Sequence, residues 1–206
     1  MGNLSPWGVM VSRIVPIVEG LGERASIRTL INLIVAQDDT SVDVNSPIQL
    51  DRGKIVKPAS LARYVELAAK SAGADGGILV LFDADDDCPV ELVGQCDAAL
   101  KSSGLPYEIA VANRTYESWF VASVESLAGY RGLLDGLICP ESPEQVGNPK
   151  AWLEDRHRDN QGGMKRWRYR ETIDQPGLTS RISVEQARRS RSFAHVENAI
   201  RRLAAA

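Results

Sequence analysis

The sequence predicts an α/β fold with a mostly parallel central sheet flanked by helices, followed by a basic, mainly helical C-terminal part. Three observations carry this prediction. Segments with the composition of strands alternate with segments whose apolar residues recur at helical spacing. Residues 77–82 are apolar throughout, which is typical of a strand covered on both faces in a parallel sheet. Glycine and proline separate the segments, so most elements have a visible end.

The N-terminal part contains a predicted strand, a helix and an irregular connection. The stretch SRIVPIV, at 12–18, has the composition of a strand and ends at Glu19-Gly20. Residues 23–36 are predicted to be helical. Four of their apolar side chains recur at i, i+3, i+4 and i+7: Ile27, Leu30, Ile31 and Ile34. Residues 40–50, which Pro47 interrupts, are expected to be irregular or to form a short strand.

Two helices that begin at proline alternate with two further strands. Pro58 begins a helix that Gly73 ends, and Pro89 begins another that ends at Gly104. The predicted strands occupy 77–82 and 107–113. This order repeats the strand–helix alternation of a parallel sheet.

The remaining chain is expected to be helical with one long loop. The stretch TYESWFVASVESLAG, at 115–129, is predicted to be a helix with Trp119 and Phe120 in the core. Residues 140–149, rich in Pro, Glu and Gly, are expected to form a loop, and a last helix begins near Val184. We therefore expect an α/β domain over 10–135. Residues 136–206 are expected to form a basic, mainly helical extension packed on the same core.

Composition narrows the class of protein. The chain has 206 residues and no run of 18 apolar ones, and its opening MGNLSPWGVM lacks the features of a secretory signal, so no membrane span and a cytoplasmic location are expected. Three cysteines without a CxxC pair suit reduced thiols. Two histidines leave little basis for a zinc site or a histidine triad. Both His157 and His195 are expected to be structural or at the surface.

The charge is unevenly distributed. Residues 150–206 hold 13 Lys and Arg against 7 Asp and Glu, whereas residues 1–149 hold 11 against 20. A basic segment of this kind indicates a polyanionic ligand, although a solvated helix face would give the same count. Residues 156–170 mix six basic residues with Trp167 and Tyr169, which suits phosphate contacts and base stacking, or equally a partner-docking surface.

Acidic residues follow three of the predicted strands. Glu19 and Glu23 follow the first strand, the cluster DADDD follows the second, and Glu117 follows the third. Ligands of open α/β sheets bind beyond the carboxyl ends of the strands, so these side chains should meet at one edge. Strand alternation would send Asp83 and Asp85 to the same face, where both can bind one ion. Oxygen ligands favour Mg²⁺ or Mn²⁺.

Each of these acidic features also has a purely structural explanation. Glu19, Glu23 and Glu117 could be charges at helix N-termini, where the helix dipole favours them. The DADDD cluster could be a solvated turn. Asp86 is expected to cap the next helix or to face solvent.

At these residues the sequence resembles a known family. VEG after one apolar strand and LFDADDD after another resemble the Toprim domain of topoisomerases, bacterial primases and the OLD (overcoming lysogenization defect) nucleases. The stretches PIVEGLGER, ILVLFDADDDCP, VANRTYESWFVAS and SFAHVENAIRRL together resemble a Toprim-like family of uncharacterised bacterial proteins, often encoded beside ATPases of ABC or SMC type. The resemblance covers about residues 12–203 and implies a Toprim-like, Rossmann-like fold.

The resemblance also implies roles for individual residues. Glu19 matches the Toprim glutamate, a metal ligand or general acid/base, and Asp83 and Asp85 match the metal-binding DxD pair. Glu23 matches the second glutamate of the OLD-type EGxxE pattern, which serves a second metal, Glu117 resembles the later acidic residue of those nucleases, and Asp87 is a further candidate ligand. A lysine near the scissile phosphate is also implied. Lys165 is the candidate for it, with Arg166, Arg168 and Arg170 as alternatives, and these arginines and Trp167 are expected to bind nucleic acid.

The expected function is therefore a metal-dependent nuclease that uses one or two Mg²⁺ (or Mn²⁺) ions on DNA or tRNA. The resemblance implies a phage-defence effector that works with an ABC/SMC-like ATPase. Two other classes stay open: a non-catalytic regulatory subunit that binds such an ATPase, and a phosphotransfer or phosphatase domain. Against the last, DADDD lacks the Thr or Ser that follows DxD in haloacid dehalogenases, and YEIAVAN lacks the lysine of a receiver domain.

Overall fold

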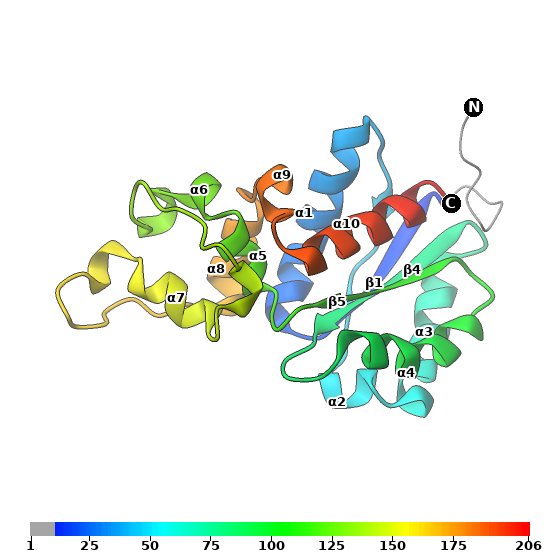
Figure 1. Ribbon diagram of the computed structural model, residues 1–206. Helices are drawn as coiled ribbons and strands as arrows, with labels where there is room; N and C mark the ends of the chain where they lie inside the picture. The colour runs from blue at the N-terminus through cyan, green and yellow to red at the C-terminus, as the bar shows by residue number, and fades with distance from the viewer. Residues whose placement is uncertain (1–10) are drawn as a thin grey trace.

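A computed structural model describes residues 11–206 and confirms the α/β class (Figure 1). Its sheet is parallel in every pairing, with β1 and β4 in the centre and the order β2-β1-β4-β5, and β3 also pairs with β1. The strands are β1 (Arg13–Val18), β2 (Asp43–Val44), β3 (Ile48–Gln49), β4 (Gly76–Asp83) and β5 (Tyr107–Ala112). The opening stretch MGNLSPWGVM, and with it the expected domain start at residue 10, lies outside the described residues.

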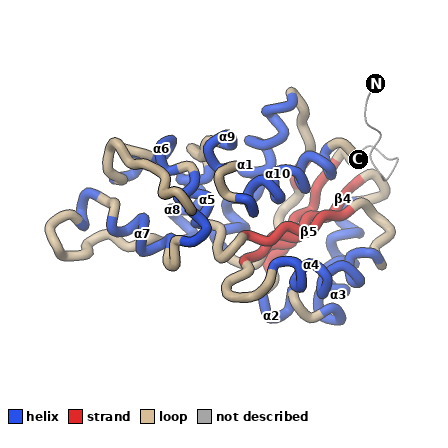
Figure 2. Tube along the Cα trace, viewed as in Figure 1, coloured by secondary structure: helices blue, strands red, loops and turns tan. Residues whose placement is uncertain are grey.

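Helices cover both faces of this sheet (Figure 2). The α-helices are α1 (Leu21–Val35), α2 (Arg52–Ile55), α3 (Pro58–Ala72), α4 (Pro89–Lys101), α5 (Glu117–Ala122), α6 (Val124–Leu127), α7 (Pro149–Asp155), α8 (Glu171–Thr179), α9 (Val184–Ala187) and α10 (Arg191–Ala204). Short 3-10 turns are η1 (Ala36–Asp38), η2 (Tyr130–Gly132), η3 (Pro143–Gln145) and η4 (Arg158–Asn160).

The alternation of side chains along β1 divides the core into two layers. Ile14 and Val18 face the layer that contains α1 and α10, whereas Val15 and Ile17 face the layer that contains α3 and α4. Both layers are built from buried aliphatic and aromatic side chains, so the central strands are apolar on both sides. The sheet can therefore meet polar groups only at its ends, and this constraint locates the site.

The C-terminal part extends the first of these layers. Trp119 of α5 packs edge-to-face against Phe193 of α10, with ring centroids 5.4 Å apart, and Leu178 of α8 belongs to the same hydrophobic cluster as Ile14 of β1. Beyond this cluster the chain around α7 projects away from the sheet (Figure 1). The last residue returns to the sheet, where the Ala206 carbonyl accepts a hydrogen bond from the Val11 amide.

Two predicted helices are interrupted in the structure. The helix expected over 115–129 is split into α5 and α6 at Ser123, whose backbone is not helical (φ −112°, ψ 22°). The Ser123 hydroxyl accepts a hydrogen bond from the Ser183 amide, so a contact with a distant segment fixes the break. The last helix is likewise divided into α9 and α10, and Ser190 caps α10 by accepting from the Phe193 amide.

Of the helices in the described part of the chain, none is both long enough and apolar enough to cross a bilayer.

Phe193 provides a test of the packing between the C-terminal part and the core. Phe193→Ala should lower the free energy of unfolding by about 3–5 kcal/mol, because it leaves a cavity against Trp119. His195→Ala, on the exposed side of the same helix, should change it by less than about 0.5 kcal/mol. Urea denaturation measures both. Equal effects would show that α10 does not pack as described.

Candidate functional site

Two carboxylates meet at the carboxyl end of the sheet because their strands are neighbours. Glu19 follows β1 directly and Asp83 is the last residue of β4, and the two strands pair in register up to Val18 and Leu81. The Glu19 carboxylate accepts a hydrogen bond of 3.2 Å from the Asp83 amide. The expected convergence of these two residues is therefore observed.

Two further carboxylates enter the same region from helices. Glu23, in the first turn of α1, is 8% exposed and accepts a hydrogen bond of 3.0 Å from the Gln175 side chain. Glu117, in the first turn of α5, is 2% exposed. Both lie close enough for their charge to act on Asp83. We name Glu19, Glu23, Asp83 and Glu117 the inner carboxylates.

The inner carboxylates destabilise one another when ionised. Burial raises the pKa of Asp83 well above its ordinary value, and the charges of Glu117 and Glu23 raise it further. The Tyr116 amide, which donates to Asp83 over 2.9 Å, opposes this shift only in part. Burial also raises the pKa of Glu19 and of Glu117. The folded protein therefore favours bound protons, or another source of positive charge, at this place.

Lys150 supplies one positive charge to the inner carboxylates. Its ammonium lies 3.7 Å from a Glu117 oxygen and also forms an ion pair with Glu171. Burial lowers the pKa of Lys150, but the charges of Glu117, Glu171 and Asp83 outweigh this effect and raise it. Lys150 therefore stays protonated. Asn148, which caps α7, and Pro149 at its first turn place this lysine, and that capping pattern was the available sequence signal.

Lys165, the lysine expected from the sequence, has other partners. Its ammonium lies 2.9 Å from Asp155 and 3.8 Å from Glu154. These carboxylates belong to α7 and not to the edge of the sheet. Lys165 is therefore neutralised locally, and the structure brings Lys150 instead to the inner carboxylates.

The prediction that Asp83 and Asp85 share a face was wrong. The strand ends at Asp83, and Asp85 adopts a left-handed conformation (φ 50°), so strand alternation does not extend to it. The carboxylates of Asp85 and Asp87 instead form ion pairs with the Arg52 guanidinium, with N···O distances of 3.4 Å and 2.5 Å. Asp86 forms an ion pair with Arg114 and is exposed, as expected, but does not cap α4.

Arg52, which the sequence analysis did not single out, organises the turn after β4. Its guanidinium donates to the carbonyl oxygens of Asp83 (3.2 Å) and Ala84 (3.0 Å) as well as to the Asp87 carboxylate. The hydrogen bond to Asp87 raises the pKa of Arg52. The outer acidic residues, Asp85 and Asp87, are thus already neutralised by a fixed cation.

The basic stretch forms part of the projecting segment around α7. Arg168 donates to Glu154 over 2.8 Å, whereas the side chains of Arg166 and Arg170 are exposed. Trp167 stacks on His157 with ring centroids 4.4 Å apart. His157 is buried and bonded to the Arg131 carbonyl, so its role is structural, as expected.

The donor set suits a hard cation in its chemistry but is not pre-arranged around one. All four inner groups are carboxylates, the ligands that Mg²⁺ and Mn²⁺ prefer, and their mutual repulsion would be relieved by a divalent ion. Nevertheless, within residues 11–206 no three Asp, Glu, His or Cys side chains are positioned to hold one ion together. An ion would need side chains to reorient.

Fold and site together define a parallel α/β protein with buried carboxylates and a lysine at the carboxyl edge of its sheet. Residues 18–201 match the family described as Domain of unknown function (DUF4276), and the chain belongs to that family. No curated protein matches the chain. No solved structure matches it either.

Asp83→Asn should stabilise the metal-free protein, and the gain should grow with pH. Because folding raises the pKa of Asp83, its carboxyl does not weaken the fold below the ordinary carboxyl pKa; the penalty grows as pH rises from that value to the folded pKa and stays constant above it. The amide still accepts from Tyr116 without carrying charge.

Thermal unfolding in EDTA between pH 4 and 8 measures this effect, which should reach about 1 kcal/mol or more at pH 8. Asp43→Asn, an exposed carboxylate outside the site, is the control. A gain independent of pH would contradict the electrostatic account.

Proposed function

We propose that the chain is a Toprim-type, Mg²⁺-dependent nuclease that cleaves phosphodiester bonds. The convergence of four carboxylates, of which Glu23 and Glu117 are buried and Glu19 and Asp83 half-buried, with Lys150 at the carboxyl edge of a parallel sheet carries this proposal. The resemblance of the VEG and DADDD stretches to Toprim sequences supports it. Nucleic-acid phosphates would bring negative charge to this edge, and Lys150 and a cation would offset it.

The inner carboxylates would hold Mg²⁺ or Mn²⁺, one or two ions, with Asp85 and Asp87 as further ligands if they leave Arg52. Such an ion supplies a Lewis acid and a water of lowered pKa. Glu19, whose pKa burial raises, would be the group that takes up and returns a proton. Lys150 would contact a phosphate oxygen.

The surroundings of the site fit a nucleic-acid substrate. Arg166 and Arg170 are exposed, and with Arg168 and Trp167 they form the proposed binding surface for DNA or tRNA. Residues 136–206 would act as an extension of the Toprim-like domain, because their apolar residues share its hydrophobic cluster. A cytoplasmic location, an ABC/SMC-like ATPase partner and a role in phage defence remain part of the proposal on the resemblance alone.

A non-catalytic regulatory subunit is the second candidate. Arg52 neutralises Asp85 and Asp87, and no ready ion site exists within residues 11–206. A protein that kept the fold for binding an ATPase would show this arrangement. The two candidates differ in whether the purified chain cleaves nucleic acid.

Purified protein should cleave plasmid DNA or total tRNA in Mg²⁺ or Mn²⁺ but not in EDTA. Asp83→Asn and Glu19→Gln should each lower the rate by about 100-fold or more, because each removes a proposed ion ligand. Asp43→Asn should retain the wild-type rate. Unchanged cleavage in both site variants would refute the site, and no cleavage by wild type would favour the regulatory subunit.

The choice of lysine can be tested separately. Lys150→Met should lower the cleavage rate by roughly 100-fold, because the charge beside Glu117 is lost, whereas Lys165→Met should leave it within a few-fold. Lys150→Arg preserves the charge and controls for folding. The reverse ranking of the two methionine variants would restore Lys165 as the catalytic lysine.

A further inference from the structure

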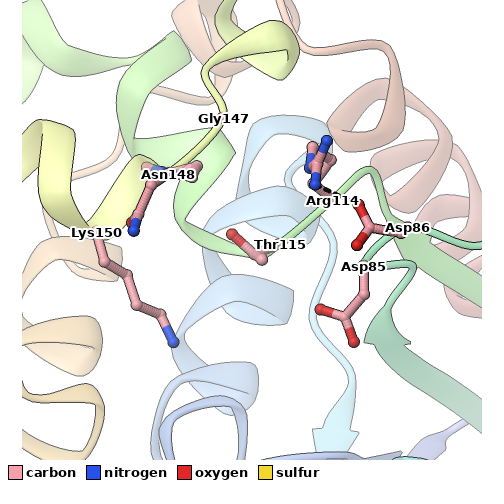
Figure 3. A pocket seen from close by; sticks show the side chains of 8 residues that line it. Asp85, Asp86, Arg114, Thr115, Gly147, Asn148 and Lys150 are labelled. Carbon is pink, nitrogen blue, oxygen red and sulfur yellow. Dashed lines mark hydrogen bonds and ion pairs between the residues drawn. The ribbon is translucent and has the colours of Figure 1, made fainter.

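A polar pocket opens beside the inner carboxylates. It has a volume of about 250 Å³ and lies between the turn after β4, the segment that follows β5 and the start of α7 (Figure 3). This is smaller than the ~300–1,000 Å³ of sites for drug-sized ligands, and it suits one planar ring system. Five of its lining side chains carry hydrogen-bonding or charged groups that face the pocket, namely Asp85, Asp86, Thr115, Asn148 and Lys150, so a polar ring is favoured over an apolar one.

One wall of the pocket carries donors. Lys150 and Asn148 come from the start of α7 and lie on the same side in Figure 3. The Asn148 oxygen is held by the Ala151 amide at 2.9 Å, which fixes the orientation of its NH₂ group. No residue in the described part of the chain accepts a hydrogen bond from that NH₂ group. Thr115, whose buried hydroxyl interacts with Glu117, lies between the walls.

The opposite wall carries acceptors. Asp85 and Asp86 lie across the pocket from Lys150 (Figure 3). Each pairs with an arginine, Asp85 with Arg52 and Asp86 with Arg114. Their side chains are 56% and 85% exposed, so oxygen atoms remain accessible to a ligand. The pocket thus presents two carboxylates, with the Arg114 guanidinium beside Asp86, on one side and an ammonium and an amide on the other (Figure 3).

We propose that this pocket binds the guanine base of a nucleotide. Guanine carries N1–H and N2–H₂ donors on one edge, which suit carboxylates, and O6 and N7 acceptors on the adjacent edge, which suit the Asn148 amide while Lys150 faces the phosphate. Adenine would direct ring-nitrogen acceptors at the carboxylates, and no pyrimidine carries two neighbouring donors beside its acceptors. The consequence of guanine binding rests on the proposed function: in a nuclease, the guanine would lie next to the cleaved bond and set the cleavage preference.

Binding of free nucleotides in EDTA tests the pocket without requiring cleavage. Isothermal titration calorimetry should detect binding of GMP and no measurable binding of AMP. IMP lacks the N2 amino group and should bind about tenfold more weakly than GMP. Asp86→Asn should weaken GMP binding by about tenfold and abolish the difference from IMP. Glu91→Gln, an exposed carboxylate outside this pocket, is the control.

The Asp86 variant separates recognition from simple electrostatics. Loss of a negative charge would strengthen the binding of every anionic nucleotide if charge alone mattered, whereas guanine recognition predicts a selective loss for GMP. Equal affinities for GMP, IMP and AMP, or stronger GMP binding in Asp86→Asn, would overturn the proposal. The proposal would also be overturned if GMP did not bind at millimolar concentration and the protein bound guanine-containing and inosine-containing single strands equally.

Oligonucleotides distinguish a free nucleotide from a strand as the source of the base. A labelled single strand with one guanine among thymines should bind more tightly than the same strand with inosine; tight GMP binding without this difference would assign the pocket to a free guanine nucleotide. Guanine binding without cleavage would refute the nuclease proposal and support the guanine pocket. Cleavage without guanine binding and without a preference for guanine would refute the guanine pocket and support the nuclease proposal.

Discussion

Electrostatic repulsion among the inner carboxylates is the constraint on which the rest of the site depends. Asp83 is the half-buried last residue of a strand whose other residues are buried, and burial raises the pKa of its carboxyl group. Glu19, Glu23 and Glu117 add charge at the same place. The C-terminal part provides partners for this negative charge: Lys150 forms an ion pair with Glu117, and the Gln175 side chain donates a hydrogen bond to Glu23. Residues beyond 136 are therefore required by the electrostatics of the sheet edge as well as by packing.

The side chains of the acidic stretch after β4 divide between two sets of contacts. Asp83 remains with the inner carboxylates, whereas Asp85 and Asp87 pair with Arg52, although Asp85 is still close enough for its charge to raise the pKa of Glu19. The left-handed Asp85 lies in a turn that the Asp87 amide closes by donating to the Ala84 carbonyl, so the chain reverses direction within two residues of the strand end. Arg52 also bonds the carbonyl oxygens of Asp83 and Ala84, so it fixes the backbone at the point of division.

Most of the fold could be predicted from the sequence, and the limits have physical causes. The central strands and α1, α3 and α4 follow from periodicity and from proline and glycine at their ends, which are local signals. The break at Ser123 depends on a bond to Ser183, and α8 contains Pro176 and little apolar periodicity, so both depend on tertiary contacts. Within the site, proximity of Glu19 and Asp83 followed from strand order, whereas the direction of Asp85 depended on one backbone angle and on Arg52.

The pairing of Asp85 and Asp87 with Arg52 also predicts which carboxylates a cation would bind first. Asp85 and Asp87 already have a partner, so a cation gains little there unless Arg52 is displaced. Burial raises the pKa of Asp83, Glu19 and Glu117, so replacing their protons with a divalent ion relieves repulsion directly. An ion should therefore bind first to Asp83 and its inner neighbours. Asp85 could join such an ion only at the cost of its contact with Arg52.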